Sequence, residues 1–173
     1  MTQKVKEEIA ASIAAFRLPR YEEIPDVGLY LEQAVKYISE YLEPLEDITL
    51  TTSMVSNYVK KGLLPSPVKK QYGREQIAHL FFIAVAKTVM SIEDIRILLE
   101  LQRRTYKSQR AYDYFALEFE NVLRYVLGIK ENLDNIGVDA TDEKEILRNI
   151  IITVAHKVYL DKRVAILHEE EKE

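Results

Sequence analysis

Apolar residues recur at helical spacing along nearly the whole chain, and this pattern restricts the fold more than any other feature. In one such segment Ile77, Leu80 and Ala84 fall on one face of a helix. Gly and Pro number only 5 each in 173 residues, which favours long regular elements. We therefore predict a mainly α fold. The expected helices cover about residues 2–16, 27–42, 52–61, 73–89, 92–102, 108–134 and 142–168.

The breaks between these helices carry recognisable turn and capping residues. Gly62 stands where a helix ends in a left-handed residue, and Pro65 excludes helix directly after it. Strand is expected only at 49–50 or 68–72, and both stretches are short. Polar caps are predicted at Asp26 for the second helix, at Thr51 or Thr52 for the third and at Ser91 for the fifth.

Basic residues gather in one window of a chain whose net charge is −4. Residues 51–74 contain no Asp or Glu. A local positive field attracts a polyanion such as DNA even to an acidic protein, but an ordinary solvated patch explains the charge equally well. The basic residues of this window are Lys60, Lys61, Lys69, Lys70 and Arg74.

The helix expected at 52–61 has the composition of one that reads DNA bases. Asn makes bidentate contacts to adenine, and Ser and Lys contact base edges or phosphates. Lys69 and Lys70 follow in an extended loop, where they are placed for phosphate contacts. The alternative is a polar surface helix followed by an ordinary loop. The predicted DNA-binding residues are Thr52, Ser53, Ser56, Asn57, Lys60, Lys61, Lys69, Lys70 and Arg74.

Several blocks in residues 51–101 resemble the winged-helix domain of MerR-type transcription regulators. The recognition helix of that family ends in Arg-x-Tyr and a Gly-Leu turn, matched here by Ser56-Asn-Tyr58 and Gly62-Leu63. The wing is similar at Lys69-Lys-Gln-Tyr72, and a later block is similar at Ser91-Ile-Glu-Asp-Ile95. The resemblance implies a winged helix-turn-helix, flanked by N- and C-terminal helices, that binds double-stranded DNA. It also implies that Tyr58, Gly62 and Tyr72 are structural braces.

Two departures from the MerR pattern support a second interpretation. Ser56 and Lys70 stand where the family has arginines. Lysine keeps a phosphate contact, but neither residue supplies the bidentate fork of a guanidinium. The alternative function is therefore a protein-interaction or adaptor module on a winged-helix scaffold that no longer reads DNA.

The layout of residues 16–102 also resembles a bacterial domain-of-unknown-function family, DUF1836. The likeness rests on Leu18-Pro-Arg-Tyr21, Ile24-Pro-Asp26 and Leu29-Tyr30, followed by the winged segment. It implies a regulator-like winged fold and supplies no established activity. The helix expected at 27–42 would then brace the reading helix.

The remaining residues give no indication of an enzyme. His79, His156 and His168 lie in no catalytic or metal-binding motif, and Cys is absent. We therefore predict no catalytic residue, no metal ligand and no cofactor.

Two regions are expected, at residues 1–105 and 106–173. The first holds the N-terminal helices and the winged segment, and the second holds helices that pack on it or form a homodimer. A second basic cluster lies around Arg103 and Arg110. Three interpretations stay open for it: an extension of the DNA-binding surface, a site for an anionic effector, or a solvated helix junction. No apolar run approaches the length of a membrane span, so no membrane contact and a cytoplasmic location are expected.

Overall fold

The computed structural model describes residues 3–137 and 140–172. Helices dominate these residues and the strands form one short antiparallel ladder, so the predicted mainly α class is confirmed. None of the described helices combines the length and the apolarity that crossing a bilayer requires. The elements are α1 (Gln3–Ser12), η1 (Tyr21–Glu23), β1 (Leu29–Tyr30), α2 (Leu31–Leu42), η2 (Glu43–Leu45), α3 (Thr52–Lys60), β2 (Gln71–Tyr72), α4 (Arg74–Ala86), α5 (Ile92–Thr105), α6 (Ser108–Val126) and α7 (Asp142–Glu170).

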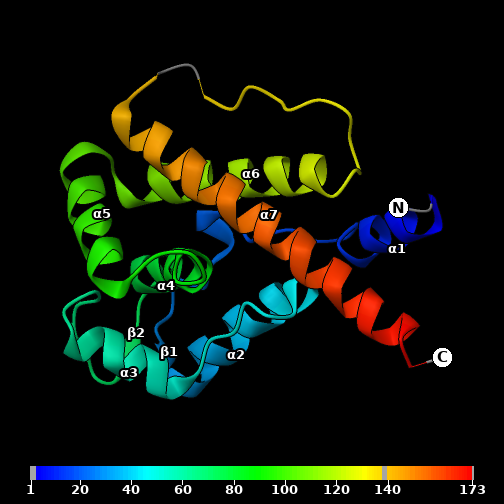
Figure 1. The fold of residues 1–173 in the computed structure, drawn as a ribbon. Coiled ribbons are helices and arrows are strands. Elements are labelled where there is room, and N and C mark those ends of the chain that lie inside the picture. Colours follow the sequence, from blue (N-terminus) through cyan, green and yellow to red (C-terminus); the bar gives the residue numbers. More distant parts are fainter. Residues whose placement is uncertain (1–2, 138–139, 173) are drawn as a thin grey trace.

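Helix α4 is the centre of the molecule because most of its side chains are apolar. Of its 13 residues, 9 are buried. Helices α2, α6 and α7 pack against it, and Figure 1 shows α4 almost end-on between them. One continuous hydrophobic core results, with buried residues from Val5 to Val158. The C-terminal helices therefore share their core with the segment that contains α3.

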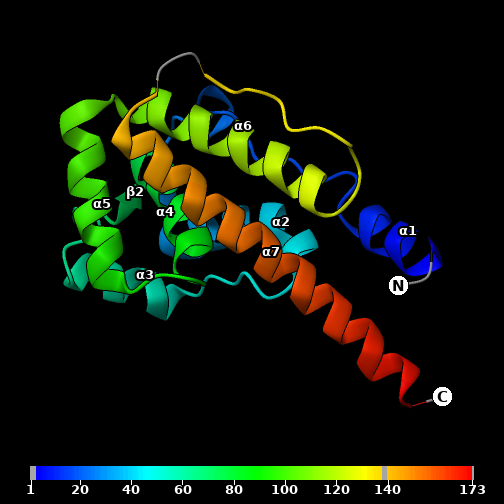
Figure 2. The same cartoon turned by 45° about the horizontal axis from the view of Figure 1, so that its top comes forward.

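Helices α6 and α7 lie side by side and make the most extensive helix pair of the fold (Figures 1 and 2). The last turns of α7 extend past the other helices (Figures 1 and 2), whereas Val158 and Lys162 in its C-terminal half are buried. Leu160, Val164 and Leu167 are exposed on the same half of the helix.

The segment between α1 and η1 is attached to α6 by charged and polar contacts. One carboxylate oxygen of Glu120 accepts hydrogen bonds from the Leu18 backbone N–H (2.9 Å) and from Arg20 Nη1 (2.7 Å). The other accepts from Arg20 Nη2 at 2.9 Å. The Tyr112 hydroxyl donates to the Pro19 carbonyl at 2.9 Å. These bonds fix the direction in which the chain enters the β1–α2 segment.

The predicted start of the second helix was wrong. Helix α2 begins at Leu31, so Asp26 does not cap it, and the two residues before it form strand β1. The backbone N–H of Tyr30 donates to Gln33 Oε1 at 2.9 Å, which satisfies a group at the helix start. No strand forms at 49–50, one of the two stretches in which strand was expected.

Two other helices end four or more residues earlier than predicted. Helix α1 stops at Ser12 rather than near residue 16, and α6 stops at Val126 rather than near 134. Gly128, at φ 78°, terminates α6 in the left-handed conformation. The chain then returns along α6, where the Asn121 side chain binds both the backbone N–H and the carbonyl of Asp134.

Candidate nucleic-acid interface

Helix α3 presents one buried and one exposed face. Its N-terminus is capped by Thr51, one of the two threonines predicted for this role, whose hydroxyl oxygen accepts the Met54 N–H at 3.2 Å. Val55 and Tyr58 point into the core. The side chains predicted to read DNA are all exposed, and α3 lies at the end of the molecule away from α6 and α7 (Figure 1). They are Thr52, Ser53, Ser56, Asn57, Lys60 and Lys61.

A glycine turn ends α3 and sends the chain back into the core. Gly62 has φ 76°, and its N–H donates to the Val59 carbonyl at 3.0 Å. The N–H of Leu63 donates to the Tyr58 carbonyl at 2.9 Å, which completes a Schellman motif. Leu63 is only 1% exposed and acts as an apolar anchor behind the turn. Gly62 thus ends the helix and Tyr58 is buried beneath it, while the bracing roles implied by the MerR resemblance stay a prediction.

A tight hairpin turn carries the next two basic residues. Val68 and Gln71 exchange backbone hydrogen bonds of 2.9 and 3.1 Å, and Lys69 and Lys70 stand between them. Both lysines have left-handed backbone, at φ 50° and 65°. Positive φ at both central residues is the mark of a type I′ turn, in which Asn-Gly is preferred. Two lysines at such positions are strained, and both are exposed to solvent.

The hairpin is joined to the start of α2 by the two-stranded ladder. Leu29 pairs with Tyr72 and Tyr30 with Gln71. Gly28 lies so close to this ladder that a Cβ atom there would be 2.7 Å from the Cβ of Gln71. Tyr72 is buried, which is consistent with its predicted bracing role. The ladder thus connects the exposed lysine turn to the helix that packs against α3.

Arg74 is the one predicted DNA-binding residue that the structure turns away from this surface. Its Nε donates to the Ile24 carbonyl and its Nη1 to Glu22, both at 2.9 Å. Its guanidinium also lies over the Tyr21 ring. Because these contacts tie Arg74 to η1, we leave it out of the candidate interface and assign it to fixing the start of α4.

The candidate interface is accordingly α3 with the lysine turn, and positive charge dominates it. Lys60, Lys61, Lys69 and Lys70 are exposed, and residues 51–74 contribute no carboxylate. Glu93, at the start of α5, is the acidic neighbour. Its pKa is lowered by its hydrogen bond with Arg96 and, to a smaller extent, by the charge of Lys61.

The histidines lie apart from this surface. His79 is buried in α4 with its Nε2 3.3 Å from Gln102 Oε1, and burial lowers its pKa. His156 is exposed on α7. Among the described residues, no three His, Asp or Glu side chains converge as metal ligands would.

A family model described as "Domain of unknown function (DUF1836)" matches residues 19–115. The match covers the segment from η1 through α5 and the first part of α6; it begins at 19 rather than 16 and ends at 115 rather than 102, the limits expected from the sequence layout. No curated protein and no solved structure matches the chain.

Proposed function

We propose that this chain, which belongs to the DUF1836 family, is a DNA-binding transcription regulator with a MerR-like winged helix-turn-helix. Helix α3 would enter a major groove, and the turn at Lys69 and Lys70 would contact the phosphate backbone. The observation that carries the proposal is the strained lysine turn. Left-handed, non-glycine residues are retained where surrounding structure or function requires them, and here both project charge outward.

The exposed face of α3 supports base reading in addition to phosphate contact. Asn57 and Ser56 lie on the solvent side, while Val55 and Tyr58 hold the helix in place from beneath. A rigid helix with short polar side chains can approach base edges closely. Asn57 is the residue we assign to adenine, because its amide both donates and accepts.

The test is binding to mixed-sequence duplex DNA over a range of salt concentrations. The triple variant Lys60→Glu, Lys69→Glu, Lys70→Glu should lose the salt-dependent binding of the wild type. Loss of three phosphate contacts alone reduces the slope of log affinity against log salt by about 2.7. The matched control reverses three exposed lysines at the far end of the molecule and leaves binding unchanged. These are Lys4, Lys6 and Lys172.

The alternative is an interaction module that keeps this scaffold without reading DNA. The exposed apolar side chains Leu160 and Val164 on the C-terminal half of α7 favour a protein contact there. Wild-type protein without salt-dependent DNA binding, or a triple variant that binds like the wild type, would refute the regulator proposal and leave this alternative.

A further inference from the structure

One side chain in the first turn of α4 holds the lysine turn from both sides. The backbone N–H of Gly73, directly after strand β2, donates to Gln76 Oε1 at 2.9 Å. The Pro65 carbonyl, in the segment that enters the turn, accepts from Gln76 Nε2 at 2.9 Å. Because residues 65 and 73 lie on opposite sides of the turn in the sequence, the amide of Gln76 ties its two legs together and to α4.

The partners of this amide fix its orientation. A backbone N–H only donates and a backbone carbonyl only accepts, so Oε1 must face Gly73 and Nε2 must face Pro65. A glutamate at position 76 could keep the first bond but not the second, because a carboxylate only accepts. The two roles of Gln76, capping α4 and holding the turn, can therefore be separated.

The leg that enters the turn has few backbone donors of its own. Pro65 and Pro67 have no N–H, so neither can donate a backbone hydrogen bond. Ser66 and Val68 are exposed. The leg that leaves the turn is instead paired with β1 along both residues of β2. The bond from Gln76 to the Pro65 carbonyl therefore matters most for the entering leg.

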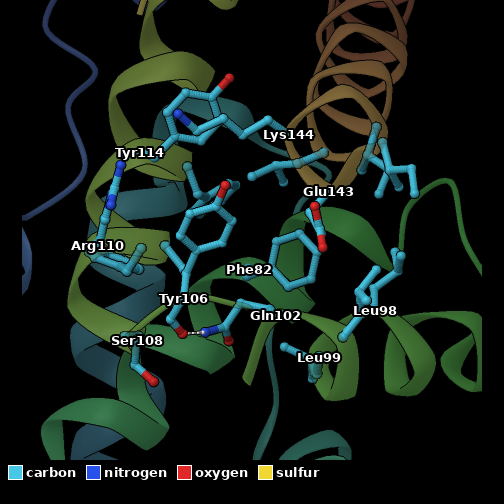
Figure 3. A pocket seen from close by; sticks show the side chains of 18 of the residues that line it. Phe82, Leu98, Leu99, Gln102, Tyr106, Ser108, Arg110, Tyr114, Glu143 and Lys144 are labelled. Atoms are coloured by element: carbon cyan, nitrogen blue, oxygen red, sulfur yellow. Dashed lines mark hydrogen bonds between the residues drawn. The ribbon is translucent and has the colours of Figure 1, made fainter. Parts of the chain in front are cut away.

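The last turn of α5 supports the same loop nearer its start. Arg103 Nη2 donates to the Leu63 carbonyl at 3.3 Å. Gln102, beside it on α5, donates from Nε2 to the Tyr106 carbonyl at 2.8 Å (Figure 3), and its Oε1 lies 3.3 Å from His79 Nε2 of α4. Helices α4 and α5 are thus joined to each other, and both hold the loop that carries the turn.

We propose that Gln76 is a positioning residue that sets the direction in which Lys69 and Lys70 face DNA. The inference rests on the proposed function, in which these lysines contact phosphate. Both lysines have left-handed backbone, a conformation that persists only where the surrounding structure enforces it. If one leg were released, binding would have to order the turn, and that cost would lower the affinity.

Hydrogen exchange without DNA tests the attachment itself. Gln76→Met removes both bonds, whereas Gln76→Glu removes only the bond to Pro65. Both variants should speed exchange of the Val68 N–H, which donates to the Gln71 carbonyl across the turn, about fivefold, the effect of one hydrogen bond. Amides in the core of α6 should exchange as in the wild type. Wild-type exchange at Val68 in Gln76→Glu, or equal acceleration in α6, would overturn the proposal.

A double-mutant cycle in duplex DNA binding tests the effect on the lysines. Replacing Lys69 and Lys70 by Gln should weaken binding about fivefold less in Gln76→Met than in the wild type, since the coupling is that of one hydrogen bond. Lys60→Gln on α3 is the matched control, and its effect should be equal in both backgrounds.

The cycle also separates the failure of this proposal from that of DNA binding. A wild type without salt-dependent binding would overturn the proposed function and the positioning role with it. Additive effects of Gln76→Met and the lysine pair, in a protein that does bind DNA, would overturn the positioning role alone.

Discussion

Replacing Lys69 and Lys70 by Asn and Gly is expected to stabilise the protein and weaken its binding to DNA. The two lysines occupy left-handed positions of a tight hairpin turn, at φ 50° and 65°. Asn and Gly are the residues that such a turn prefers. The same substitution removes two exposed charges from the candidate interface. Stability and DNA affinity should therefore change in opposite directions.

The size of each effect follows from the turn geometry. A residue with a Cβ atom in the left-handed conformation destabilises the folded protein by about 1–2 kcal/mol. Glycine avoids this cost, but its greater conformational freedom in the unfolded chain offsets roughly 0.5–1 kcal/mol of the gain in stability. With Asn tolerated at the other position, the net gain is about 1 kcal/mol, and the midpoint of thermal unfolding should rise by about 2–4 °C. Loss of two phosphate contacts reduces the salt slope of DNA binding by about 1.8.

Urea unfolding followed by circular dichroism measures the first effect, and fluorescence anisotropy with labelled duplex DNA measures the second. The matched control is Lys69→Gln with Lys70→Gln, which removes the charges but keeps side chains at both left-handed positions. It should lose DNA affinity like the Asn-Gly variant without gaining stability. An Asn-Gly variant that is less stable than wild type would refute the turn geometry. An unchanged salt slope would refute the phosphate contacts.

Three other predictions follow from contacts described above. Glu120→Ala should lower the free energy of unfolding by about 2–3 kcal/mol in urea titrations, because the guanidinium of Arg20 and a backbone N–H lose a largely buried carboxylate; an unchanged value would show that the pair is not formed. Burial lowers the pKa of His79 below its value in the unfolded chain, so stability is full above about pH 6.5 and falls as the unfolded chain takes up a proton below it. His79→Gln should lose less stability than wild type between pH 7.5 and pH 5, and parallel curves would contradict this. If the C-terminal helices form a homodimer, the double variant Leu160→Glu, Leu167→Glu should sediment with the mass of one chain and keep the helix content of the wild type. A wild type that is monomeric at all concentrations would exclude the homodimer.

Local signals in the sequence were sufficient to predict α3 and its boundaries. A hydroxyl cap at Thr51 and a left-handed glycine at Gly62 act within one turn of the helix that they delimit. Apolar residues at helical spacing, Val55 and Tyr58, then place one side of α3 in the core and leave the polar side exposed. For this reason the structure exposes all the side chains of α3 that the sequence assigned to DNA reading.

Contacts between distant parts of the chain account for what could not be predicted. Strand β1 exists because Leu29 and Tyr30 pair with residues 71–72, and the isolated sequence around Leu29 reads as the start of a helix. Arg74 belongs to the basic window 51–74, yet its side chain donates hydrogen bonds to Glu22 and to the carbonyl of Ile24. No short-range pattern distinguishes it from the exposed lysines.

The end of α6 illustrates a weaker signal that was available. Apolar residues continue at Leu127 and Ile129, which extended the predicted helix toward residue 134. Gly128 interrupts that pattern, and its left-handed backbone allows the Ile129 N–H to donate to the Arg124 carbonyl at 2.8 Å. A glycine followed by an apolar residue is the usual form of such a helix end.

Because α4 is at the centre of the fold, the segment that the family model matches does not contain all of the helices that bury α4. The family match ends at residue 115, within α6, although α4 is covered on another side by α7, which lies wholly beyond it. The unit recognised by sequence similarity is therefore smaller than the unit that closes the core. A fragment cut at the limits of the match would leave the surface of α4 that α7 covers open to water.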